Sequence, residues 1–504
     1  MVWPTEYDVK LGEFNAMELP GQQLPASHAH TPLDHVLNLD INASPGCQRL
    51  TGIIATMGPS TYDVEVLEQM IASGMNMALL NINFGTKEDH LEAIKLLRLA
   101  AKNYSTEVGR NYPLAIGMRL SGKKIRTGLI ADSYGEAVEL KTGETVRLTT
   151  DETYKDRCST CTIYVDFMHF ADQVSKGDYV LLDNETIMLK VEIISSTTLT
   201  CKIERGGFLG SCKDVFVPNV CLDMPNYSDR DKEYINMAIS NQLDIIVAPY
   251  SFNATLGIMI TRQELGSDIT PKKLVIAQKN IIARANKANI PVCINAHLLS
   301  TMRNKRVPLR AELLDVANCI LDGADALVLS AETAVGEFPV DAVSCLAAAC
   351  KEAEACIWSK QIFYDFVEKT PIPCDQATGI AMAAVLAAQR SIAAVIIVVT
   401  SSGKSAQIVS KFRPRCPIIA VTRYGPIARQ LHLWRGIIPL IYEGTPDIDW
   451  QVDLNKRVTF CTTFAMERGF VRVGDPIIII SGWRQGSGYT NSMRIMYAEA
   501  DIVM

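Results

Sequence analysis

The chain has 504 residues, 48% hydrophobic and 21% charged, a balance typical of a folded protein of three or four domains. Its 49 Lys and Arg residues against 55 Asp and Glu give a net charge of −6, which argues against nucleic acid or an anionic membrane as a partner. No apolar run approaches the roughly 20 residues of a membrane span, and no signal-peptide pattern opens the sequence. The 14 Cys residues form no disulfide framework, so we expect a cytoplasmic protein.

Residues 1–45 are rich in Pro, His and Asn and are expected to form an N-terminal arm. After them, short apolar runs alternate with segments whose apolar residues recur at helical spacing, a pattern typical of a parallel α/β architecture. We predict a parallel α/β domain over 46–119 and 223–360. Its expected strands are 52–57, 77–82, 113–118, 244–249, 257–261, 291–295 and 326–329. Its expected helices include 64–73, 90–102, 274–287 and 311–321.

Two further domains are predicted from changes in this rhythm. Residues 120–222 carry Val-, Thr- and Ile-rich stretches at short spacing with glycines between them, which indicates a small all-β module inserted between two halves of the α/β domain. Residues 361–504 return to α/β character and are predicted to form a C-terminal α/β domain. Its expected elements are a helix over 375–390 and strands over 392–400, 418–421 and 476–481, followed by a Gly-rich loop.

Several short motifs follow one another along the chain. They are Thr51–Ser60, Ser73–Asn76, Ile125–Gly128, Arg310–Glu312, Leu321–Asp325, Glu332–Ala334 and Ser481–Gly488. In this order and spacing the chain resembles the pyruvate kinase family, animal type, over about 30–494. The resemblance implies that 46–119 and 223–360 form a TIM-type (β/α) barrel with its active site at the C-terminal ends of the strands. It implies that 120–222 form a small β-barrel lid domain. It also implies phosphoryl transfer from phosphoenolpyruvate to ADP, with magnesium and potassium.

The barrel departs from the family in its length. Only six residues, 251–256, separate the strands expected at 244–249 and 257–261, whereas a parallel crossover needs at least about 10–12. We therefore expect a barrel that lacks one βα unit and closes incompletely. The Lys and the magnesium-binding Glu that the family carries on that unit are absent with it.

The implied catalytic site has also lost single residues. Leu79 stands where the family has an Arg that neutralises phosphate, and Arg119 replaces an Asp that ligates potassium. Ala296 replaces a Thr that assists protonation of the enolate. Because a guanidinium can only donate hydrogen bonds, Arg119 cannot ligate a cation. These losses argue against magnesium and potassium binding as the family has it.

Three residues of the implied site remain. Arg126 is a vestigial phosphate contact or, alternatively, a surface Arg at the junction of barrel and lid. Asn81 is a second vestigial residue, and Glu264 is a vestigial magnesium ligand in place of the family's Asp. Lys123 and Lys124 lie near the site in sequence and could supply replacement charge.

The C-terminal domain retains the pieces of the family's regulatory pocket for fructose 1,6-bisphosphate. They are a hydroxyl-rich turn that can cradle an anion, a Trp and an Arg seven residues apart, and a Gly-rich loop. The candidate binding residues are Thr400, Ser402, Gly403, Lys404, Ser405, Trp450, Arg457, Gly486, Ser487 and Gly488. The alternative is that the turn only caps a helix and the loop is only a tight turn.

The leading hypothesis is a pyruvate kinase-like pseudoenzyme, catalytically impaired, that acts through assembly or sugar-phosphate binding. The first alternative is an active pyruvate kinase of glycolysis with a rearranged site, and the second is a purely structural scaffold subunit. The expected partners are a sugar bisphosphate and, in a homo- or hetero-oligomer, other pyruvate kinase-like chains. Nucleic acid and membranes are not expected as partners.

Overall fold

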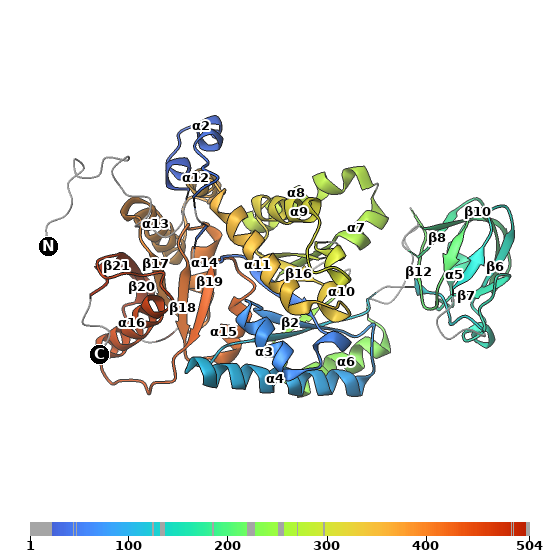
Figure 1. The fold of residues 1–504 in the computed structure, drawn as a ribbon, viewed down its shortest axis with the longest axis horizontal. Coiled ribbons are helices and arrows are strands. Elements are labelled where there is room, and N and C mark those ends of the chain that lie inside the picture. The colour runs from blue at the N-terminus through green and yellow to red at the C-terminus, as the bar shows by residue number, and fades with distance from the viewer. Residues whose placement is uncertain are drawn as a thin grey trace.

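The molecule consists of three parts in a row, with the barrel between the lid at one end and the C-terminal domain at the other (Figure 1). The computed structural model describes residues 23–499 except 44, 47, 123–124, 132–136, 184–185, 219–226, 250–256, 270, 296–297, 485 and 487. Within these residues, no helix has the length and apolar character needed to cross a membrane.

Seven parallel strands form the barrel sheet. They are β1 (Gly52–Thr56), β2 (Met77–Asn81), β3 (Ala115–Arg119), β13 (Ile245–Val247), β14 (Ile258–Thr261), β15 (Val292–Asn295) and β16 (Ala326–Leu329). Their order is β13-β3-β2-β1-β16-β15-β14. The strands that flank the short link, β13 and β14, are thus the two edges of the described sheet. The barrel is nearly closed, and the prediction that it lacks one unit is confirmed.

Helices surround this sheet on its outer face (Figure 1). They are α3 (Val64–Ala72), α4 (Lys87–Val108), α6 (Asp229–Ser240), α7 (Arg262–Asp268), α8 (Leu274–Lys287), α9 (Arg310–Leu321), α10 (Ala331–Ala334) and α11 (Pro339–Ala355). The helix expected at 90–102 is longer at both ends. Thr86 and Asp89 form a capping box that adds the first turn, and Gly109, with φ of 70°, stops the last.

The lid is an all-β insertion, as predicted. Its strands are β4 (Ile125–Arg126), β5 (Val138–Leu140), β6 (Thr145–Thr149), β7 (Thr162–Tyr164), β8 (Tyr179–Leu182), β9 (Ile187–Ile194), β10 (Thr198–Arg205), β11 (Gly207–Leu209) and β12 (Asp214–Phe216), with one short helix, α5 (Phe170–Gln173). Seven of them form one sheet in the order β4-β12-β8-β9-β10-β6-β7. A bridge between Thr127 and Val165 joins its two ends, so the sheet curls back on itself.

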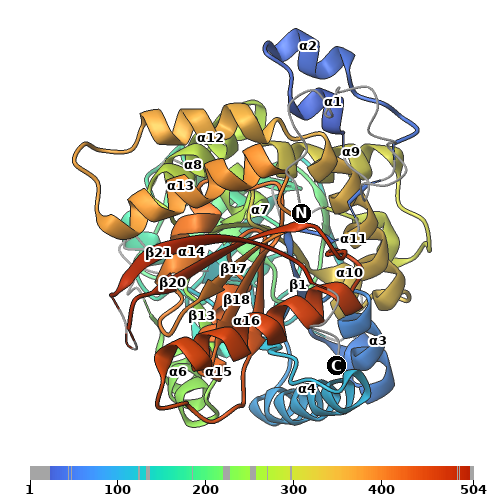
Figure 2. The ribbon, with the colours of Figure 1, turned by 90° about the vertical axis from the view of Figure 1, so that its left-hand side faces the viewer.

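The C-terminal domain is a five-stranded sheet between helices (Figure 2). Its strands are β17 (Val395–Val399), β18 (Ile418–Thr422), β19 (Ile437–Ile441), β20 (Pro476–Gly482) and β21 (Thr490–Tyr497), and its helices are α12 (Ser359–Glu368), α13 (Gln376–Ser391), α14 (Lys404–Lys411), α15 (Gly425–Leu431) and α16 (Trp450–Glu467). In β17, Ile396 and Val398 pack toward α13 and α14, and Ile397 packs toward α16. Because both faces are covered, β17 is apolar throughout.

The expectation that 476–481 is the last strand is wrong. After the Gly-rich loop the chain returns as β21, antiparallel to β20, and pairs Ile478 with Ile495 at the sheet edge. Its side chains are only half-buried or exposed, so it lacks the apolar signal that marks β20.

The C-terminal domain packs on the barrel through buried charged groups. Arg413 lies 2.6 Å from Asp325, which follows α9, and the two side chains are 9% and 3% exposed. Arg429 of α15 pairs with Asp244 just before β13 at 2.7 Å. Since breaking a buried pair leaves an uncompensated charge, these contacts hold the two domains in one orientation.

The described part of the N-terminal arm contains two short helices, α1 (Leu24–Ser27) and α2 (Pro32–Leu37). The ring of His35 stacks on Trp358, 5.4 Å between centroids, just before α12. This contact places the arm against the C-terminal domain.

Candidate functional site

At the mouth of the barrel, Arg119 and Glu264 form an ion pair. Arg119 ends β3, and Glu264 lies in the first turn of α7, directly after β14. Arg119 Nη2 lies 2.6 Å from Glu264 Oε1, and the side chains are 12% and 17% exposed. The C-terminal ends of parallel strands meet at one edge, so two residues far apart in sequence come together here.

The other residues at the end of β2 are engaged in local contacts. Asn81 Oδ1 accepts a hydrogen bond from the Asn83 backbone N–H at 3.1 Å, and Ser121 Oγ donates to Asn83 Oδ1 at 2.7 Å. Leu79 is 1% exposed and belongs to an apolar cluster with Ile54. Asn81 therefore closes a turn, and Leu79 fills the interior.

The polar side chains at and after the ends of β15 and β16 likewise form hydrogen bonds within the chain. Ser330 Oγ donates to Asn295 Oδ1 at 2.7 Å, and the Ser330 backbone N–H donates to Glu332 Oε2 at 2.7 Å. Asn295 and Glu332 are buried. Ala296 lies outside the described residues.

Arg126 lies in the lid. It is part of β4, its Nε is 3.3 Å from Asp214 Oδ1 of β12, and its backbone N–H donates to Asp166 Oδ1 at 2.6 Å. Burial raises the pKa of Asp166. Arg126 thus pairs within the lid sheet, while Arg119 and Glu264 pair with each other at the barrel. Lys123 and Lys124 lie outside the described residues.

In the C-terminal domain, a cradle follows β17. Thr400 Oγ1 accepts a hydrogen bond from the Gly403 N–H at 2.9 Å. Gly403 has φ of 79°, and a Cβ there would lie 3.1 Å from Leu431 Cδ2, so this position requires glycine. The hydroxyls of Ser405 and Thr490 lie 2.6 Å apart, which ties the cradle to β21.

Arg457 is the buried cation of this region. It is 7% exposed on α16, a helix that begins after Asp449, whose side chain accepts from the Gln451 N–H. One Nη of Arg457 bonds to Asp453 a turn earlier, and its guanidinium lies 5.6 Å from the Trp450 ring centroid. Its Nε is buried and has no hydrogen-bond partner among the described residues. An unused donor in this position is a site for an incoming acceptor.

One guanidinium group and one carboxylate of this site, those of Arg423 and Asp453, were missed from the sequence. Arg423, directly after β18, donates to Asp453 at 2.6 Å and 3.2 Å and to the Gly444 carbonyl at 3.0 Å. Arg484 lies 3.8 Å from the Tyr489 ring centroid in the Gly-rich loop. Arg423 could have been predicted from its position, because it directly follows a strand that neighbours β17. Ligands of parallel α/β sheets bind beyond the carboxyl ends of such strands.

These pieces enclose a cavity of about 160 Å³. Of the candidate residues, seven line it: Thr400, Ser402, Ser405, Trp450, Arg457, Gly486 and Gly488. Gly403 shapes the turn, Lys404 is exposed on α14 away from the lining, and Ser487 lies outside the described residues. Arg423, Arg457 and Arg484 line the cavity, and Asp453 balances one of the three charges. The cavity is therefore cationic and suits a phosphorylated ligand.

Comparison with known proteins covers most of the chain. The family model for "Pyruvate kinase, barrel domain" matches residues 48–255 and 250–343, and that for "Pyruvate kinase, alpha/beta domain" matches 378–496. Pyruvate kinase PKLR of Rattus norvegicus is 38% identical over 94% of this chain and 89% of its own length. Pyruvate kinase 2 of Candida glabrata is 33% identical over 92% and 97%, and pyruvate kinase 1 of Saccharomyces cerevisiae 31% over 92% and 99%. The chain belongs to the pyruvate kinase family.

Proposed function

We propose that this pyruvate kinase family protein is impaired in phosphoryl transfer and acts in the cytoplasm through sugar-phosphate binding and assembly. The observation that carries the first half is the ion pair of Arg119 with Glu264 at 2.6 Å. A magnesium site usually combines one or two carboxylates with substrate phosphate. Here a guanidinium already faces the carboxylate that stands in the family's ligand position, so the residues present do not fit the family's magnesium site.

The remaining losses act in the same direction. Leu79, in place of an Arg, is buried among apolar side chains and offers nothing to a phosphate. Since removing one preorganised charge-stabilising group costs roughly 10²–10³ in rate, several losses together leave little catalysis.

The cationic C-terminal cavity supports the binding half of the proposal. Pyruvate kinases are typically tetramers with an allosteric sugar-phosphate site, and the family model of this domain covers the cavity residues. The buried, unpartnered Nε of Arg457 and the Thr400 turn supply donors for phosphate oxygens. We propose a sugar bisphosphate as the ligand and a homo- or hetero-oligomer with pyruvate kinase-like chains as the assembly.

The competing function is an active pyruvate kinase. It is favoured by the 31–38% identity to curated pyruvate kinases over more than nine-tenths of the chain. Turnover of phosphoenolpyruvate and ADP, measured beside rat PKLR, separates the two. We expect kcat/KM at least ~10⁴-fold below that of the relative. We also expect Glu264→Ala to leave any residual rate unchanged, because Glu264 serves no metal.

A kcat/KM within about 100-fold of the relative that falls in Glu264→Ala would contradict the proposal. Calorimetry with fructose 1,6-bisphosphate then separates a ligand-binding protein from a purely structural subunit. We expect saturable binding to the wild-type chain, and its absence would favour the structural subunit.

A further inference from the structure

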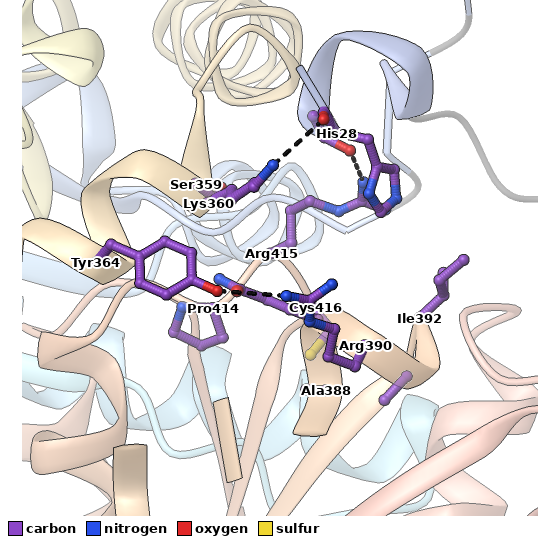
Figure 3. Close-up of a pocket in the computed structure, with 13 residues that line it drawn as sticks. His28, Ser359, Lys360, Tyr364, Ala388, Arg390, Ile392, Pro414, Arg415 and Cys416 are labelled. Carbon is purple, nitrogen blue, oxygen red and sulfur yellow. Dashed lines mark hydrogen bonds between the residues drawn. The ribbon is translucent and has the colours of Figure 1, made fainter. Parts of the chain in front are cut away.

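A second cationic cavity lies between the N-terminal arm and the C-terminal domain, apart from the Arg457 pocket. It has a volume of about 80 Å³. Its lining comes from the end of α1, from α12, from the last turns of α13 and from the segment that precedes β18. Figure 3 shows Lys360, Tyr364, Arg390 and Arg415 arranged around this space, below the turn that carries His28.

The cavity gathers positive charge without a counter-charge. Lys360, Arg390 and Arg415 all line it, and none of the described lining residues is acidic. Burial, followed by the charges of Arg415, Lys360 and Arg390, lowers the pKa of His28. Burial also lowers the pKa of Arg415. Like charges held together in a partly buried space repel one another, so an anion would relieve this repulsion.

The cations are held by neutral groups. Lys360 Nζ donates to the backbone carbonyls of His28 and Ala29 at 3.3 Å and 3.2 Å. Arg415 donates to Ser27 Oγ at 2.7 Å, and Arg390 to the Tyr364 hydroxyl at 3.5 Å. A guanidinium has five N–H donors, so both arginines keep donors for a further acceptor.

An independent observation concerns Gln389. Its side-chain Nε2 is buried in the wall of the cavity and has no hydrogen-bond partner among the described residues. Buried polar atoms in native proteins are nearly always satisfied, by protein, by water or by a ligand. The amide of Gln389 therefore leaves one donor unsatisfied in the wall of this cavity.

We propose that this cavity binds a phosphate-class oxyanion, free phosphate or the phosphate group of a monoester, and so fastens the arm to the C-terminal domain. One water molecule needs about 10–15 Å³ of such space, so about 80 Å³ is enough for a tetrahedral oxyanion. The donors that line it are Lys360 of α12, Arg390 of α13 and Arg415. The inference is independent of the function proposed for the Arg457 pocket.

The test uses the full chain with the substitution Arg457→Ala, so that binding of phosphate in the Arg457 pocket contributes least to the measured response. Inorganic phosphate or glycerol 2-phosphate is titrated against chloride at equal ionic strength. We expect the phosphates alone to raise the melting temperature and to slow amide exchange in the arm. Arg390→Gln should weaken phosphate binding about tenfold or more, while Arg284→Gln, an exposed control on α8, changes nothing. A response to inorganic phosphate alone would identify the free ion as the occupant.

Gln389→Leu separates binding from folding. In the phosphate-free protein it removes an unsatisfied donor, so stability should stay equal or rise, whereas phosphate affinity should fall several-fold. Equal effects of phosphate and chloride would overturn the proposal. Unchanged phosphate affinity in both Arg390→Gln and Gln389→Leu would overturn it as well.

Discussion

At the mouth of the barrel one guanidinium faces one carboxylate, Arg119 against Glu264. The C-terminal pocket is lined by three guanidinium groups, of which two, those of Arg423 and Arg457, share the carboxylate of Asp453. The first site cancels its own charge and satisfies its polar groups within the chain. In the second, the buried Nε of Arg457 has no hydrogen-bond partner in the part of the chain that the structure describes. Both sites lie at the carboxyl ends of parallel strands, so their position in the fold does not explain the difference.

The difference shows that one protein can carry two kinds of site, one whose charges are paired internally and one that has excess positive charge. A site that supplies its own counter-charge gains nothing from an external ion, because binding would first have to break the internal pair. A site with excess charge and an unused donor gains from every matching oxygen. Three measurements test whether this contrast holds, and a fourth tests the boundary between the two regions.

The largest effect is expected from Arg457→Ala. Hydrogen bonds to charged groups contribute roughly 1.5–3 kcal/mol, so affinity for fructose 1,6-bisphosphate should fall about 10–100-fold in calorimetry. Ser405→Ala should cost less, because it removes a neutral hydroxyl. Lys456→Ala is the matched control: Lys456 is the next residue on α16 and pairs with Asp447 outside the cavity. Equal losses in Arg457→Ala and Lys456→Ala would remove the distinction between the two regions.

The boundary between barrel and C-terminal domain should be sensitive to acid. His432 lies there, with Nε2 3.0 Å from the Pro113 carbonyl, and burial lowers its pKa to about 4. Between that value and about 6.5 the unfolded chain binds the extra proton, so stability rises with pH. From pH 7 to pH 5 the native state should lose ~2 kcal/mol through this group.

Denaturant unfolding of wild type and His432→Gln at both pH values measures this loss. The variant should lose ~2 kcal/mol less than wild type over the same interval, since glutamine does not titrate. If the two proteins showed the same pH dependence of stability, folding would not change the pKa of His432.

A smaller effect is expected at the barrel mouth. In a double-mutant cycle of Arg119→Ala and Glu264→Ala, the coupling free energy should be about 1 kcal/mol, because the pair is largely but not fully buried. Urea unfolding of the four proteins gives this quantity. Strictly additive effects would mean that the contact contributes nothing, and the contrast between the sites would then rest on the pocket alone.

The smallest effect is expected from magnesium. Millimolar Mg²⁺ should change the melting temperature of wild type and of Glu264→Ala equally, because the carboxylate is engaged by Arg119. A rise in wild type that disappears in Glu264→Ala would restore Glu264 as a metal ligand. Arg119→Ala serves as the control that exposes the carboxylate without removing it.

Much of the fold follows from patterns within short windows of sequence. The helix expected at 274–287 has the bounds of α8, and the apolar run around Val395–Val399 is a fully buried strand. Elements without such a signal were missed. Pro439 interrupts β19, and β21 is an edge strand with half-buried or exposed side chains. Lid strands as short as Ile125–Arg126 exist only through their partners.

The sequence by itself determined the seven barrel strands, the short link between two of them and the three segments of the C-terminal pocket. Each of these features depends only on residues that lie close together in the sequence. Only the tertiary structure decided which charges meet. Arg119 pairs with Glu264, which lies 145 residues further along the chain. Arg423 pairs with Asp453, and two secondary-structure elements, α15 and β19, lie between them in the sequence. Such pairs depend on strand order and packing, since a short window of sequence holds only one partner of each.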